Sequence, residues 1–184
     1  AAGLCLFNNV AVAARVLQDF YGIERLAIID FDVHHGNGTQ NTFYQDPSVL
    51  YVSLHGHPLY LYPHTGYEEE TGDGPGRGYT LNIALRPGTN DDEYRELVRT
   101  RVIPELQRYA PQFFLLSAGF DAHAEDPLGN LRLTDDTFAW LTDTLVRVAD
   151  QLADGRVVSV LEGGYNLAVL ERCVAEHVRR LGAA

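Results

Sequence analysis

The sequence predicts an α/β fold with a mostly parallel sheet and helices on both faces. Short apolar runs of strand length alternate along the chain with segments whose apolar residues recur at helical spacing. The first run, Leu26–Phe31, is apolar almost throughout, which is typical of a strand covered on both faces. Strands that alternate with helices form crossover units, and these units build parallel sheets.

Cap residues and apolar spacing define four helices. Asn8 or Asn9 caps the first, which ends near Gly22. A second follows the cap region Asn90–Asp92 to about Tyr109, with a kink expected at Pro104. Two more helices are expected at 134–153, capped by Thr134, and at 166–181. The predicted strands are 26–31, 49–54, 79–85, 113–118 and 156–161. Long loops at 56–78 and 119–133 separate them, and loops of this length are often functional.

Composition limits the function classes. The 184 residues suit one full-sized domain, and 46% apolar residues are enough to bury a core. Acids outnumber bases 25 to 14, which argues against a nucleic-acid-binding surface. No apolar run approaches the roughly 20 residues that cross a bilayer. Two cysteines, Cys5 and Cys173, exclude a disulfide scaffold and are expected to pack as small apolar residues. We therefore expect a cytoplasmic protein without nucleic-acid or membrane partners.

Polar residues gather where the predicted strands end. The first strand leads into Asp30–Gly36, and the second carries Ser53 and His55. The fourth is followed by the segment 119–123 and the fifth by 162–165, where two glycines precede a tyrosine. Ligands of open α/β sheets bind beyond the carboxyl ends of the strands, so these four clusters predict one functional rim.

The spacing within these clusters favours a metal site. Asp30, Asp32 and His34 are spaced by two, so an extended backbone points them to one face. Asp32, His34 and Asp121 form a ligand set of one nitrogen and two oxygens, which holds catalytic zinc when a fourth position stays open. Fe²⁺, Co²⁺ or Mn²⁺ would suit the same ligands. The alternative is that the aspartates cap the following turn and His34 is a core histidine.

The other polar residues have simpler interpretations. Tyr165 is either a hydrogen-bond donor to a developing oxyanion or an ordinary turn aromatic. We expect the histidines of the long loop to face solvent or tether the loop, and His177 to lie on the surface. Residues 68–70 predict a solvated acidic run, which as an acidic rim would attract a cationic substrate. The loop histidines are His55, His57 and His64.

Several multi-residue motifs occur in a fixed order along the chain: Gly3–Asn9, Asp30–Gln40, Tyr62–Gly66, Ser117–His123, Asp126–Gly129 and Glu162–Asn166. They resemble the histone deacetylase family of zinc-dependent amidohydrolases, which includes acetoin-utilisation proteins and acetylpolyamine amidohydrolases. The pattern is nearer to the class II and bacterial members than to class I. The resemblance implies a three-layer arginase/deacetylase-like fold, with residues 1–184 as a single partial domain that lacks its N-terminal part.

The resemblance also implies roles for individual residues. Zn²⁺ would bind to Asp32, His34 and Asp121, and Tyr165 would polarise the acetyl carbonyl. The carbonyl of Gly3 would accept the substrate amide N–H. The tunnel for the alkyl chain would be lined by Leu4, Tyr62, Leu128, Gly163 and Gly164. One K⁺ or Na⁺ site would use Asp30, Asp32, His34, Ser53 and Leu54. The other would use the backbone near Phe43, Asp46, Val49 and Tyr79.

Two departures from the family pattern affect these expectations. Leu4 stands where the family has a tunnel Phe, which suggests a wider channel. The family's tandem histidines, which act as general base and acid, precede the Gly-x-Cys motif that here begins at Gly3. We therefore expect the chain alone to bind metal but to have weak or no activity. An unpaired strand edge would also favour a homodimer or low stability.

The implied activity is a metal-dependent amidohydrolase reaction. Metal-activated water would remove acetyl groups from acetyl-lysine in proteins or peptides, or from acetylated polyamines. Asp121-Ala-His123 also resembles the Asp-x-His pattern of binuclear, arginase-like ureohydrolases, which is one alternative. A non-catalytic deacetylase-like domain that binds acetylated ligands is the other. One metal ion per chain would support the deacetylase, whereas two would support the ureohydrolase. Loss of activity in a Tyr165→Phe variant of the full-length protein would argue against the non-catalytic binding domain.

Overall fold

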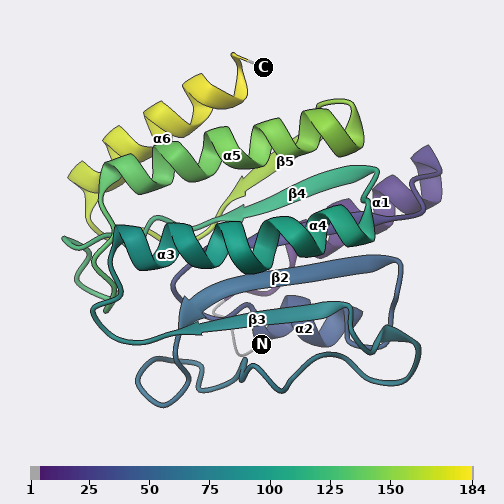
Figure 1. Cartoon of the computed structure of the whole chain (residues 1–184), viewed down its shortest axis with the longest axis horizontal. Helices are drawn as coiled ribbons and strands as arrows, with labels where there is room; N and C mark the ends of the chain where they lie inside the picture. The colour runs from purple at the N-terminus through teal and green to yellow at the C-terminus, as the bar shows by residue number, and fades with distance from the viewer. Residues whose placement is uncertain (1–4, 184) are drawn as a thin grey trace.

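A parallel five-stranded sheet forms the centre of the computed structural model, which describes residues 5–183 (Figure 1). Its order is β3-β2-β1-β4-β5, and all four neighbouring pairs are parallel. The strands are β1 (Leu26–Asp30), β2 (Val49–Gly56), β3 (Thr80–Leu85), β4 (Phe113–Ala118) and β5 (Val157–Leu161). The predicted fold class is therefore confirmed, and each strand lies within two residues of its predicted bounds.

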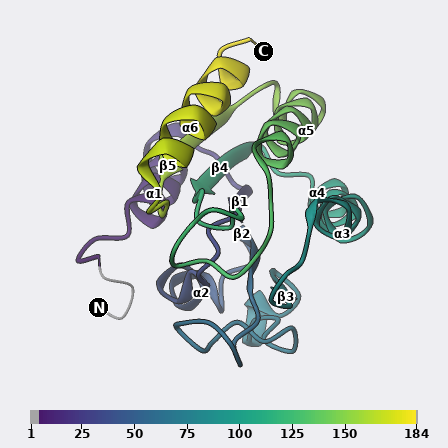
Figure 2. The ribbon, with the colours of Figure 1, turned by 90° about the vertical axis from the view of Figure 1, so that its left-hand side faces the viewer.

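The helices cover both faces of this sheet (Figure 2). They are α1 (Asn9–Tyr21), α2 (Asn37–Phe43), α3 (Asp91–Leu97), α4 (Ile103–Tyr109), α5 (Asp135–Ala153) and α6 (Leu167–Leu181). The α1 and α2 helices pack on one face, and α3, α4 and α5 pack on the other, with α6 alongside α5. None of the helices between residues 5 and 183 is long and apolar enough to span a membrane.

Side-chain alternation along the strands separates two apolar cores. In β1, Ala27 and Ile29 face the core under α3, α4 and α5, whereas Leu26 and Ile28 face α1 and α2. Every residue of β1 and β2 is buried. The β5 edge strand differs, because Val158 keeps 46% of its surface exposed. The strands that carry the candidate site thus rest on a filled core.

The topology places the carboxyl ends of β1 and β4 side by side. The chain moves outward from β1 through β2 to β3, then returns to the other side of β1 with β4. Asp30 at the end of β1 is paired with Ser117 in β4. Ligand sites of doubly wound sheets lie at such a reversal of strand order. Segments far apart in sequence therefore meet at one point of the rim.

Two helical features differ from the prediction. The helix expected between residues 90 and 109 begins with a capping box of Asn90 and Glu93, but contains a π-helical segment, Val98–Val102. This segment ends two residues before Pro104, which lacks the N–H that a regular helix uses. The short α2 helix was missed because its sequence, NGTQNTF, has no apolar periodicity.

Candidate metal centre

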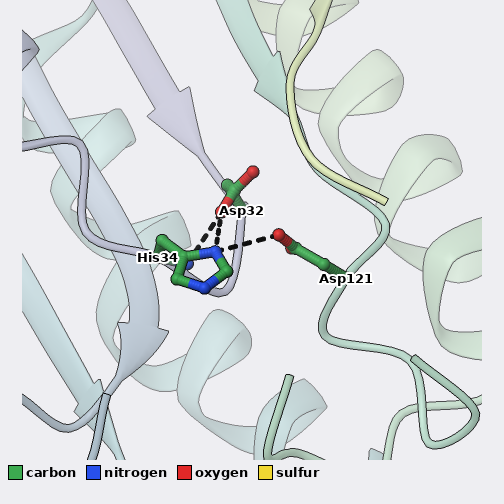
Figure 3. Close-up of side chains that lie close together, drawn as sticks. All are labelled: Asp32, His34 and Asp121. Atoms are coloured by element: carbon green, nitrogen blue, oxygen red, sulfur yellow. Dashed lines mark hydrogen bonds and ion pairs between the residues drawn. The ribbon is translucent and has the colours of Figure 1, made fainter. Parts of the chain in front are cut away.

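Three predicted ligands converge at the junction of β1 and β4 (Figure 3). Asp32 and His34 follow β1, and Asp121 follows β4. One ligand atom from each lies within 4.8 Å of the others. The His34 Nδ1 atom is 3.1 Å from Asp32 Oδ1 and 3.0 Å from Asp121 Oδ2. In the part of the chain that the structure describes, no other group of three His, Cys, Asp or Glu side chains is arranged this way.

Backbone N–H groups fix the orientation of both carboxylates. Val33 donates to Asp121 Oδ1 at 2.8 Å, which leaves Oδ2 facing the imidazole. His34 donates to Asp32 Oδ1 at 2.7 Å, and Gly163 donates to Asp32 Oδ2 at 2.7 Å. Partners of this kind hold metal ligands in place and tune their basicity. The site is therefore organised by segments that follow β1, β4 and β5.

Gly163 must lack a side chain because the two carboxylates lie against it. A Cβ atom there would be 2.2 Å from Asp121 Oδ2 and 2.5 Å from Asp32 Oδ2. Real Cβ atoms do not approach oxygen so closely. The first glycine of the Gly-Gly-Tyr sequence thus makes room for the ligands, as expected where the backbone and another group approach closely.

The charges of the cluster favour a bound cation. Burial lowers the pKa of His34, but hydrogen bonds and charge attraction from Asp121 and Asp32 outweigh it and raise this pKa to about 10. Burial, followed by repulsion from Asp32, raises the pKa of Asp121 to about 7. Without a metal, the imidazole is thus held as a cation by its neighbours. A divalent ion bound by these donors would displace that proton. The donor set therefore fits zinc or a similar ion.

Asp30 has a different position from the other two members of its motif. Its buried carboxylate accepts hydrogen bonds from the Tyr51 hydroxyl at 2.9 Å and from the Asp32 N–H at 3.3 Å. Burial and the nearby Asp32 charge raise the pKa of Asp30. It does not belong to the group of converging ligand atoms. Asp30 holds the turn that presents Asp32.

Tyr165 lies beside the cluster, at the end of the loop that follows β5. Its ring packs edge-to-face against His34, with the ring centroids 6.4 Å apart. The side chain is 47% exposed. Burial and the charges of Asp32 and Asp121 raise the pKa of its phenol, which stays protonated at neutral pH. Tyr165 can therefore donate a hydrogen bond to a group bound at the cluster.

Asp126 was not assigned a role from the sequence, although it connects two parts of the rim. Its Oδ2 accepts from the N–H of Tyr165 at 2.7 Å, and its Oδ1 accepts from the N–H of Leu128 at 2.9 Å. The carboxylate is buried. The available signal was an aspartate followed by proline in a long loop, which is typical of an aspartate that bonds nearby backbone. Asp126 fixes Tyr165 relative to the predicted tunnel wall.

The structure describes only some of the other residues that are predicted to line the tunnel. Gly3 and Leu4 lie outside the described residues. Tyr62 and Leu128 are 47% and 52% exposed. Gly164, next to Gly163, is half-buried with a φ of +142°, a conformation that favours glycine. Their roles toward an alkyl chain stay predictions.

The predicted monovalent cation sites also stay predictions. Ser53 is the register partner of Asp30, and its hydroxyl lies 2.8 Å from His55 Nδ1, while the neighbouring Leu54 is buried. At the second site, the Asp46 carboxylate pairs with Arg15 at 2.7 Å. Backbone carbonyl groups are the donors that remain there, and the residues that carry them are Phe43, Val49 and Tyr79.

The structure corrects three expectations about polar residues and one about a cysteine. His55 is fully buried and tethers the loop through Nε2, 2.8 Å from the Gly66 carbonyl, so only the tethering half of its prediction is confirmed. His177 is buried as well, because α6 packs it against α5 and β5. Glu70 accepts hydrogen bonds from two loop N–H groups rather than facing water alone. Cys5 is exposed and does not pack in the core.

His123 argues against a second metal ion. Its Nδ1 accepts from the Glu125 N–H at 3.1 Å, so the proton lies on Nε2, which is 3.0 Å from Asp135 Oδ1. Both nitrogens are therefore occupied by structural partners, and neither belongs to the converging ligand atoms. In the described residues, His123 is therefore not placed as a ligand of the second metal ion that a binuclear ureohydrolase would need.

Comparison with known proteins agrees with this geometry. The sequence-family model of the histone deacetylase domain matches residues 1–181 of this chain. The chain belongs to the histone deacetylase family. This deacetylase-family chain is 47% identical over 177 residues to histone deacetylase 10, chloroplastic, from Oryza sativa subsp. japonica, covering 96% of this chain and 40% of the relative. It is 41% identical over 173 residues to the histone deacetylase-like amidohydrolase of Pseudomonas aeruginosa. That alignment covers 94% of this chain and 45% of the relative.

Solved structures agree at the level of the fold. The acetylpolyamine aminohydrolase of Burkholderia pseudomallei superposes with a TM-score of 0.90 at 36% identity, covering all of this chain and 52% of that one. The deacetylase-family chain thus spans about half or less of the length of these relatives. The expected family and fold are confirmed, and the family is metal dependent.

Proposed function

We propose that this protein is a zinc-dependent deacetylase that hydrolyses the acetamide of acetyl-lysine or of an acetylated polyamine. The observation that carries the proposal is the convergence of Asp32, His34 and Asp121 beside Tyr165, in a chain of the histone deacetylase family. Zn²⁺ bound to these three ligands would supply a Lewis acid that polarises the acetyl carbonyl and lowers the pKa of water. Fe²⁺ or Co²⁺ would suit the same donors.

The chain's own residues would orient and stabilise the reacting acetamide. Tyr165, protonated at neutral pH, would donate a hydrogen bond to the carbonyl oxygen as negative charge develops on it. Asp126 holds the Tyr165 backbone, which keeps this donor in position. A formal charge of −11 favours the approach of a cationic amine substrate. We further propose that K⁺ or Na⁺ binds near Asp30 and Ser53 and stabilises the turn that carries Asp32.

Amine release from an acetyl-lysine peptide and from N-acetylputrescine tests this proposal. A protein that holds this chain together with the tandem histidines of the family pattern, loaded with one equivalent of Zn²⁺, is compared with its Tyr165→Phe variant. We expect metal-dependent amine release that falls by about a hundredfold or more in the variant, as for the loss of an oxyanion donor. Metal affinity should stay within about twofold, because Tyr165 is not one of the three ligands.

Two results would contradict the proposal in different ways. A chain that binds no Zn²⁺ would exclude the metal site itself. A protein that has the tandem histidines and binds Zn²⁺ and an acetylated ligand, but releases no amine with either substrate, would favour the non-catalytic binding domain.

A further inference from the structure

His177 lies in a polar site that the metal centre does not include. It comes from the last turns of α6 and is only 4% exposed. Its Nδ1 lies 2.7 Å from the Thr142 hydroxyl in α5, and its Nε2 lies 2.9 Å from the Ser159 hydroxyl in β5. One imidazole therefore joins two helices and the edge strand.

The hydroxyl partners assign the tautomer of this histidine. The Thr142 hydroxyl donates its proton to the Phe138 carbonyl at 2.9 Å. It must therefore accept from His177, so the ring proton is on Nδ1. Nε2 then accepts from the Ser159 hydroxyl. A neutral imidazole satisfies every partner, and burial lowers the pKa of His177 to about 4.

The face of His177 toward the sheet contacts two phenylalanines. Its ring packs edge-to-face on Phe31 and on Phe120, with centroid separations of 6.2 Å and 5.7 Å. The two phenyl rings are also edge-to-face with each other at 6.1 Å. Such arrangements are the preferred ones for aromatic pairs. The three rings therefore form one packed unit, the Phe31–Phe120–His177 cluster.

Each phenylalanine of this cluster directly precedes a metal ligand. Phe31 is followed by Asp32, and Phe120 is followed by Asp121. The planar peptide fixes neighbouring Cα atoms about 3.8 Å apart, so a shift of either phenylalanine moves the adjacent ligand. The backbone adds a link, because the Phe120 N–H donates to the Gly163 carbonyl at 2.8 Å.

We propose that His177 is a positioning residue for the metal centre: it holds Phe31 and Phe120, and through them the backbone segments that carry Asp32 and Asp121. The inference rests on the proposed metal site and extends it to α6, a helix that supplies no ligand. Its imidazole combines a ring that packs on the phenyl groups with a donor and an acceptor for two buried hydroxyls. An aliphatic residue would leave both hydroxyls without this partner.

Cobalt binding measures this role without relying on catalysis. The purified chain, His177→Leu and Cys173→Ala are titrated with Co²⁺, and affinity is recorded with the visible absorption spectrum. Cys173 is a matched control because it is buried on the same helix, and its thiol donates to Asp135 rather than bonding to Thr142 or Ser159. We expect His177→Leu to weaken Co²⁺ binding about tenfold and to change the spectrum, as loss of ligand support does. Cys173→Ala should stay within about twofold.

The conservative variant His177→Gln separates positioning from general packing. Its amide can donate to Thr142 or accept from Ser159, so we expect affinity between those of the wild type and His177→Leu. If His177→Leu does not fold, Ser159→Ala decides, because it removes one partner and keeps the ring. Weaker Co²⁺ binding with an altered spectrum supports the inference, and unchanged binding overturns it. Failure of the wild-type chain to bind Co²⁺ would instead contradict the proposed function.

Discussion

His34 and His177 have opposite electrostatic surroundings within one small protein. His34 lies at the rim between two carboxylates, which raise its pKa to about 10 although burial opposes them. His177 lies below the rim among two hydroxyls and two phenyl rings, and burial lowers its pKa to about 4. The same residue type is thus held as a cation in one place and neutral in the other.

This electrostatic difference distinguishes the metal-binding histidine, His34, from the positioning histidine, His177. An imidazole and two carboxylates that share a proton are arranged for a cation, and a metal ion satisfies them better than a proton does. An imidazole with one committed donor and one committed acceptor has no capacity left for a ligand. Partner chemistry, more than burial, therefore distinguishes the two histidines.

Removal of one carboxylate from the rim should have the largest effect. We expect Asp121→Asn to weaken Zn²⁺ binding by about a thousandfold, equal to about 4 kcal/mol, because one of three ligands is lost. Calorimetry with Zn²⁺ measures the change, and Asp136→Asn, an exposed aspartate of α5, is the control. Equal affinity in the two variants would place the metal elsewhere and remove the contrast between the histidines.

The two histidines should contribute opposite slopes to the dependence of the free energy of unfolding on pH. His177 contributes stability above pH 6.5, and this is lost as the pH falls toward 4, because the unfolded chain then binds more protons. A shift of this size corresponds to about 3 kcal/mol. In the metal-free chain, His34 contributes stability below pH 6.5 that is lost as the pH rises toward 10.

Urea unfolding of the metal-free chain between pH 4 and 10 measures both contributions. His177→Leu should flatten the acidic limb. Saturation with Zn²⁺ should remove the alkaline limb, since the metal replaces the proton on the cluster. An acidic limb that is identical in wild type and His177→Leu would show that other groups cause it.

Removal of the Glu70 carboxylate, which stabilises the long loop and is not a metal ligand, should have the smallest effect of these changes. Glu70 accepts from the N–H groups of Gly66 and Tyr67 and from the Gln40 amide. We expect Glu70→Gln to lower the free energy of unfolding by about 1–2 kcal/mol, measured in urea, without a change in Zn²⁺ affinity. The exposed neighbour Glu69 is the control, and Glu69→Gln should stay within about 0.5 kcal/mol. Weakened Zn²⁺ binding in Glu70→Gln would mean that this loop also shapes the rim.

Much of the fold and of the ligand set could be predicted from local sequence. Alternating apolar runs and caps such as Asn8 and Asn166 specify their elements through short-range contacts. The spacing of Asp32 and His34 places both ligands on one short segment after β1. The α2 helix could not be predicted this way, because its buried Gln40 is stabilised by distant partners, among them Asn82 and Glu70.

By itself, the sequence determined which residues bear metal-binding chemistry and that they follow buried strands, because these properties depend on residue type and spacing. Only the tertiary structure decided that Asp30 holds the turn, that His123 faces Asp135, and that His177 lies under the phenylalanines. Each of these outcomes depends on contacts between residues 12 or more positions apart in the sequence. Strand order and helix packing create those contacts, and no local pattern encodes them.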